Sequence, residues 1–125
     1  MQKIITIIAI TIFSVVQIKA QENETINLLT SGKWYAEYFI VDGQKIEYSP
    51  EVQKKTWMLF NDNDTIDYMI NGKLLKANWE YNTSNNLIKF FKEDETQEYK
   101  IISITENKML VEELGEEKSI IGWKK

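Results

Sequence analysis

Residues 31–41 read Ser-Gly-Lys-Trp-Tyr-Ala-Glu-Tyr-Phe-Ile-Val, and this stretch decides the fold. Side chains along a β-strand point alternately to its two faces. We therefore predict a strand with an inner and an outer face. The inner face would carry Trp34, Ala36, Tyr38 and Ile40, and the outer face Lys33, Tyr35, Glu37 and Phe39.

The Asn-Gly pair at 71–72 is the strongest hairpin signal in the chain, because a two-residue turn of this type needs positive φ at both positions. Counting outward from it places Tyr68 opposite Leu75 on an apolar face. Asp67 then falls opposite Lys76 on the other face. The apolar and the charged pairs therefore agree on which face is the inside.

Further strands follow in a steady meander, with no helical segment long enough for a crossover, so the sheet must be antiparallel. Residues 43–55 read as the longest loop, with a short strand extension at 45–48. A two-residue turn at Asp42 and Gly43 would pair Tyr38 with Glu47, which conflicts with an inward Tyr38, so we expect a longer or bulged connection. The fold class is all-β, an eight-stranded antiparallel up-and-down β-barrel with a short N-terminal helical turn at 24–29. Besides the first strand and the one that follows the Asn-Gly turn, the predicted strands are 56–60, 65–70, 87–92, 97–104, 108–114 and 118–124.

Gly32 stands two residues before Trp34, just after the helix-like segment and at the start of the strands. This spacing resembles the Gly-x-Trp signature of lipocalins and of small bacterial lipocalin-like domains, over residues 24–125. The resemblance implies a barrel closed at one end by the helical segment. Typical lipocalins place an arginine from the last strand across the tryptophan of the first, but this chain has no arginine. Lysines after Trp123 could cover the Trp34 indole instead.

Residues 1–20 have the pattern of an export signal, with Lys3, an apolar run over 4–16 and a cleavage site after Ala20. A retained membrane anchor is the alternative, but the run is shorter than the roughly 20 residues that span a bilayer. The chain has no cysteine, which excludes disulfides and a lipid-anchored cysteine. We expect a domain at 21–125 that is secreted or periplasmic, with no membrane span after cleavage.

The composition of residues 21–125 argues against several classes of function. Their 13 lysines against 19 acidic residues give a net charge of −6, which makes nucleic acid an unexpected partner. The chain has no His, Cys or Arg, so it lacks the usual bases, thiolate nucleophiles and phosphate clamps. We predict no enzymatic activity, no cofactor and no metal site. The calcium-like spacing of Asp62, Asp64 and Asp67 is better explained by a solvated turn with an ion pair from Asp67 to Lys76.

Aromatic residues on the predicted inner faces could either line a cavity or fill it, because an eight-stranded barrel is just wide enough for both. Trp79, Tyr81 and Trp123 would lie near the closed end with Trp34, and the 43–55 loop would hang over the mouth. Three tyrosine hydroxyls favour a partly wet pocket. The predicted ligand-binding residues are Tyr38, Ile40, Trp57, Tyr68, Leu75, Phe90 and Tyr99.

Two functions follow from these alternatives. A hollow barrel would bind a small apolar or amphipathic ligand without catalysis. A filled barrel would instead serve as a protein-binding inhibitor or immunity-type factor, and would contact its protein partner through the loops at 43–55 and 93–96.

Overall fold

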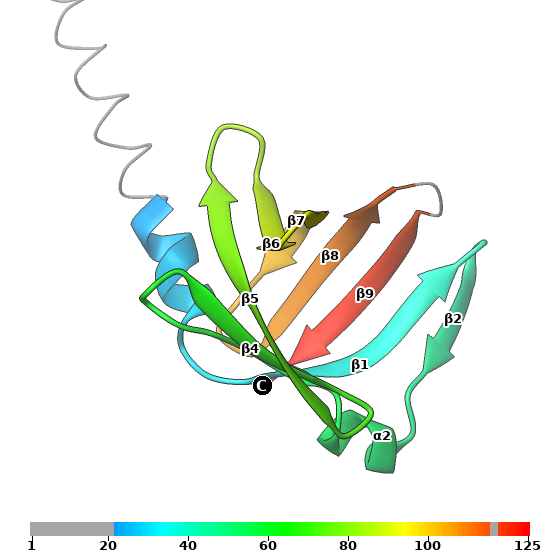
Figure 1. Ribbon diagram of the computed structural model, residues 1–125. Helices are drawn as coiled ribbons and strands as arrows, with labels where there is room; N and C mark the ends of the chain where they lie inside the picture. The colour runs from blue at the N-terminus through cyan, green and yellow to red at the C-terminus, as the bar shows by residue number, and fades with distance from the viewer. Residues whose placement is uncertain (1–21, 116–117) are drawn as a thin grey trace, which may run out of the picture.

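The computed structural model describes residues 22–115 and 118–125, so the predicted export signal at 1–20 lies outside the described residues. Within the described ranges the strands form one antiparallel sheet with the order β2-β1-β3-β4-β5-β6-β7-β8-β9, and β1 also pairs with β9 (Figure 1). This confirms the predicted eight-stranded barrel and adds one strand, β2. The strands are β1 (Trp34–Val41), β2 (Gln44–Glu47), β3 (Trp57–Phe60), β4 (Thr65–Ile70), β5 (Lys73–Asn82), β6 (Leu87–Lys92), β7 (Glu95–Ile104), β8 (Lys108–Leu114) and β9 (Ser119–Lys124).

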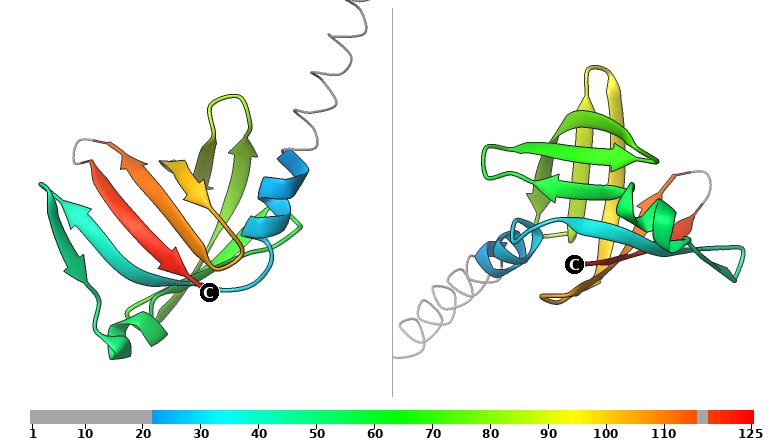
Figure 2. Two further views of the ribbon diagram at one scale, coloured as in Figure 1. Left: turned by 180° about the vertical axis from the view of Figure 1, so that it is seen from behind. Right: turned by 90° about the horizontal axis from the view of Figure 1, so that it is seen from below.

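One edge of β1 is shared by two strands. Trp34 and Tyr35 pair with β3, while the residues from Tyr38 to Val41 pair with β2. The other edge of β1 pairs with β9 and closes the barrel. Beyond its pairing with β3, β1 continues as a hairpin with β2, which is seen as the cyan and blue-green arrows at the left of the left view in Figure 2.

The connection between β1 and β2 is a tight two-residue turn, so the prediction of a longer connection is wrong. Asp42 and Gly43 have positive φ angles of 52° and 77°, and Tyr38 does pair with Glu47. The irregularity lies instead against β9, where Ala36 is opposite Trp123 but Tyr38 is opposite Gly122. The extra residue in β1 is a β-bulge, and it reverses the alternation of faces in the rest of the strand.

The bulge moves Tyr38 and Ile40 to the outer face, so their predicted inward orientation is wrong. The Tyr38 ring lies over Gly122, where an added β-carbon would be only 2.5 Å from Tyr38 Cε1. Phe39 takes the inner position in its place. It packs against Tyr48 with 5.3 Å between the ring centroids.

The predicted loop at 43–55 contains β2 and a one-turn helix, α2 (Pro50–Lys54). Ser49 caps this helix by accepting a hydrogen bond from Val52 N at 3.3 Å, and proline occupies its first turn, where no intrahelical N–H is needed. Gln53 anchors α2 to the hairpin, because its Nε2 donates to Tyr48 O at 2.9 Å. The segment is thus structured along most of its length.

The register counted from the Asn-Gly turn is confirmed. Tyr68 lies opposite Leu75, and Asp67 lies opposite Lys76. The Asp67 carboxylate is 3.8 Å from Lys76 Nζ, which confirms the predicted cross-strand ion pair. Both turn residues have positive φ, 48° at Asn71 and 90° at Gly72.

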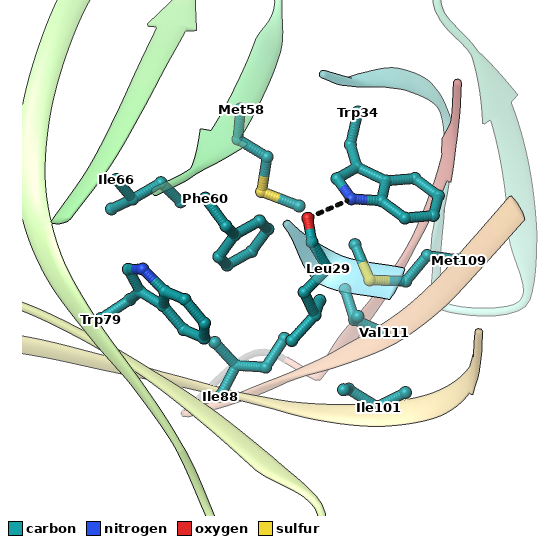
Figure 3. Close-up of a cluster of buried hydrophobic side chains, with 10 residues drawn as sticks. All are labelled: Leu29, Trp34, Met58, Phe60, Ile66, Trp79, Ile88, Ile101, Met109 and Val111. Atoms are coloured by element: carbon teal, nitrogen blue, oxygen red, sulfur yellow. Dashed lines mark hydrogen bonds between the residues drawn. The ribbon is translucent and has the colours of Figure 1, made fainter. Parts of the chain in front are cut away.

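A helix at residues 22–29 closes the end of the barrel where β1 begins (Figure 1). Its Leu29 is fully buried at the centre of the core cluster, and Leu29 O accepts a 3.0 Å hydrogen bond from Trp34 Nε1 (Figure 3). Lys125 Nζ lies 4.3 Å from the centroid of the Trp34 ring, so a lysine does cover this indole. The buried core consists of Leu29, Trp34, Met58, Phe60, Ile66, Trp79, Ile88, Ile101, Met109 and Val111.

Candidate ligand-binding cavity

The half of the barrel beyond this core encloses a cavity of about 320 Å³. It lies toward the end where β3 begins and β4 ends, away from the helix at 22–29. Every strand of the eight-stranded barrel contributes to its wall, and Tyr48, just after β2, covers it from the hairpin side. The volume is at the lower end of the roughly 300–1,000 Å³ that is typical of sites for small organic ligands.

Small side chains at two wall positions help to keep this space open. Ala36 in β1 and Ala77 in β5 both border the cavity. A larger inward side chain at either position would occupy part of the same volume, since a barrel of eight strands has little interior space to spare. The cavity is therefore a consequence of specific residues rather than of strand number alone.

A series of aromatic rings joins the cavity to the core beneath it. The Tyr99 ring packs against Phe90 at 5.3 Å, and Phe90 packs against Phe60 at 5.8 Å between centroids. Phe60 then meets Trp79 edge to face at 5.0 Å. Tilted and edge-to-face rings attract one another, so the floor of the cavity is a continuous apolar surface of packed rings.

The polar groups of the wall are few, and three of them are phenols. Within the described residues, no protein group forms a hydrogen bond with the hydroxyls of Tyr48, Tyr68 or Tyr99, whereas Tyr81 Oη donates to Asn86 Oδ1 at 2.7 Å. Gln97 borders the same space and donates from Nε2 to Leu114 O at 3.2 Å. The three phenols are thus free to donate to or accept from a bound molecule.

The Tyr99 phenol is the most perturbed titratable group of the wall. Burial, together with smaller contributions from the nearby Glu113 carboxylate and the Tyr68 phenol, raises its pKa to about 12. Burial also raises the pKa of Tyr48. Both phenols therefore stay protonated and uncharged at neutral pH.

Three of the predicted ligand-binding residues, Tyr68, Phe90 and Tyr99, are brought together in the cavity wall. Each is on the inner face of its strand and packs against the buried core. Their role as ligand contacts stays a prediction.

The other four predicted ligand-binding residues do not both face inward and border the cavity. Trp57 borders the cavity, but it pairs with Tyr35 on the outer face and its ring lies 4.1 Å from Lys33 Nζ, so its predicted inward orientation is wrong. Leu75 is on the inner-face register opposite Tyr68, yet it does not reach the wall of the cavity. Tyr38 and Ile40 lie outside because of the bulge in β1.

The prediction missed several wall residues. Gln97 could have been found, because it stands two residues before the inward Tyr99 and so shares its face. Trp123 was expected near the closed end, and it does pack against the core, but it also borders the cavity. Its Nε1 is buried and has no partner among the described residues, in contrast with Trp79 Nε1, which donates to Asn61 O at 3.0 Å.

A family model described as a lipocalin-like domain matches residues 30–111, which span β1 to the middle of β8. The chain belongs to this lipocalin-like family. No curated protein and no solved structure matches it. In this lipocalin-like domain, β9 lies beyond the matched residues, so the closure of the barrel rests on the observed pairing of β9 with β1.

The lipocalin-like domain differs from the typical pattern at its closed end, where Lys125 lies over Trp34 in place of an arginine. An ammonium over an indole is attracted to the ring quadrupole but cannot stack on it as a planar guanidinium does. Among residues 22–115 and 118–125, no helix has the length and apolar character needed to cross a membrane.

Proposed function

We propose that this lipocalin-like domain is a non-enzymatic binding protein that holds one small apolar or amphipathic molecule in its barrel. The cavity of about 320 Å³ carries this proposal, because its wall is mostly apolar and its three phenol hydroxyls have no protein partner in the described residues. An apolar body would replace water on the wall, and the hydroxyls would orient one polar group of the ligand.

The proposed site of action is outside the cytoplasm, either in the periplasm or in the medium. The expected export signal at 1–20 supports this placement. Fractionation of the native host, followed by sequencing of the mature N-terminus, tests it. A mature chain that begins at Gln21 is expected, and an uncleaved chain in the cytoplasm would contradict it.

Binding itself is tested by filling the cavity from within. Ala77 borders the cavity, and the neighbouring Asn78 points outward and is exposed. Ala77→Phe should abolish or strongly weaken the binding of small apolar molecules in a screen by calorimetry. Asn78→Phe is the matched control, since it adds the same ring to the outer surface. Both variants need a cooperative thermal transition, and a folded Ala77→Phe variant that binds as tightly as wild type would contradict the proposal.

A protein-binding role is the second candidate, and apolar side chains near the mouth favour it. Ile46 in β2 and Ile70 at the end of β4 are 46% and 54% exposed. Native mass spectrometry of protein purified gently from its own host separates the two functions. A retained small molecule supports the first function, whereas a bound protein with an empty cavity supports the second.

A further inference from the structure

We propose that the ligand is a small organic amine whose ammonium group pairs with the Glu113 carboxylate at the mouth while its apolar body occupies the cavity. This inference rests on the proposed function and specifies the chemistry of its ligand. It depends on where Glu113 lies, on the absence of a competing cation, and on the aromatic rings beside it.

The pairing of the strands places Glu113 on the inner face. It lies opposite Tyr99 of β7 on one side and opposite Ser119 of β9 on the other. Directly opposite residues of antiparallel strands share a face, and Tyr99 borders the cavity, so Glu113 lies on the cavity side near the mouth. It is half-buried, and Ser119 Oγ donates to its Oε2 at 3.0 Å.

No cation of the described chain balances this carboxylate. None of the residues that border the cavity is charged, and no lysine of residues 22–115 and 118–125 forms an ion pair with Glu113. Lys73 and Lys92 stand on inner-face positions but are exposed at the mouth, and Lys92 lies opposite Glu95. A half-buried carboxylate without a cation favours a cationic ligand and disfavours an anionic one.

The aromatic wall next to Glu113 suits the same ligand. Tyr68, Phe90 and Tyr99 all border the cavity, and the faces of such rings attract cations. The negative field of Glu113 also helps to raise the pKa of the Tyr99 phenol, which agrees with the position of this carboxylate beside the wall. That field would stabilise an ammonium in the mouth and repel a carboxylate.

Three probes with the same apolar chain test this inference: octylamine, octanol and octanoate. Their binding to the full mature domain is measured by calorimetry at neutral pH and low salt. Octylamine is expected to bind about tenfold more tightly than octanol, and octanoate more weakly than either. Added salt should reduce the advantage of the amine, because part of it is an interaction between charges near solvent.

Glu113→Gln is the decisive variant, and Glu112→Gln is its matched control. Gln keeps the shape of the side chain and an acceptor for Ser119, and Glu112 is the preceding residue, on the outer face. Glu113→Gln should remove the tenfold preference for the amine and leave the affinity for octanol unchanged. Glu112→Gln should change neither affinity.

The outcomes separate this inference from the proposed function. If octanol binds wild type as tightly as octylamine, or octanoate binds most tightly, the amine inference is overturned and the proposed function stands. An amine preference that survives Glu113→Gln also overturns it. If none of the three probes binds, the amine inference is overturned, and the effect of Ala77→Phe in the wider screen decides the proposed function separately.

Discussion

The aromatic ring of Tyr38 leaves no room for a side chain at Gly122. An ideal β-carbon at this position would lie 2.5 Å from Tyr38 Cε1, so Gly122→Ala forces the Tyr38 ring away from the surface of the sheet. We expect the variant to lose about 1–3 kcal/mol of unfolding free energy, the usual cost of overpacking. Denaturant unfolding measures the change.

The matched control is Gly115→Ala, where no atom of the described residues, apart from its sequence neighbours, lies within 4 Å of the added carbon. It should leave the unfolding free energy nearly unchanged. The double variant Gly122→Ala with Tyr38→Ala should lose less than the sum of the two single variants, because the smaller side chain removes the clash. Equal losses in Gly122→Ala and Gly115→Ala would show that the Tyr38 ring does not constrain Gly122.

The raised pKa of Tyr99 predicts that the folded protein loses stability at alkaline pH. Its pKa is raised from the usual value near 10 to about 12 in the folded protein, so the unfolded chain loses this proton first as the pH rises. Folding stability should therefore fall as the pH rises from about 10 to about 12. Tyr99→Phe removes this contribution, and its unfolding free energy should fall less steeply over the same range. Parallel curves for the variant and wild type would contradict the raised pKa.

At the level of strands, a residue of the cavity wall could be predicted only where the sequence of its strand distinguishes the inner face from the outer face. Tyr68 could be placed because the Asn-Gly turn fixes the register of β4 and β5. Trp57 could not, because β3 reads Trp-Met-Leu-Phe and is apolar on both faces. Tyr38 was misplaced because the bulge depends on the pairing of β1 with β9, which is distant in sequence. The local sign of its outward orientation was the Asp42-Gly43 turn, which pairs Tyr38 with Glu47.

The turn of the β4–β5 hairpin predicts that the stability lost on replacing Gly72 depends on the new residue. Its φ of 90° is unfavourable for residues with a β-carbon, but among the described residues an added carbon would approach only Lys55 Cδ, at 4.0 Å. Gly72→Ala should thus cost about 1 kcal/mol through the backbone alone. Gly72→Asn should cost less, because asparagine tolerates positive φ. Thermal unfolding ranks the variants, and an Asn variant less stable than the Ala variant would contradict this explanation.

In the barrel as a whole, closure brings Trp34 and Trp123 together from the two ends of the domain. Ala36 is opposite Trp123, so Trp34, two residues earlier on the same face, is a diagonal neighbour of Trp123. Trp34 is fully buried, and truncation of a buried tryptophan to alanine typically costs about 3–5 kcal/mol, so we expect Trp34→Ala to come close to unfolding. Trp123 is only partly buried against the core, so Trp123→Ala should lose less.

The double variant, Trp34→Ala with Trp123→Ala, should lose less stability than the sum of the single variants, because the two side chains share one region of the core. Denaturant melts of the three variants measure this coupling. Strict additivity would mean that the two indoles do not interact across the β1–β9 seam.

The number of strands and the closure of the barrel could be predicted from the meander of short strands, but the presence of the cavity could not. Whether a barrel of eight strands is hollow depends on the summed volumes of its inward side chains. Here Ala36 and Ala77 leave space that Phe90 and Tyr99 do not fill. That balance depends on the final orientation of each ring, and the bulge in β1 alone replaced Tyr38 by Phe39 on the inner face.

The four tryptophans of the chain occupy three kinds of environment, so their fluorescence can report on different parts of the protein. Trp34 and Trp79 are hydrogen-bonded to backbone carbonyls within the core, and the Trp57 ring faces outward beneath Lys33. Trp123 is the indole that both packs on the core and borders the cavity. If Trp123 is kept and the others are replaced by phenylalanine, fluorescence would report the entry of a molecule into the barrel without any attached dye.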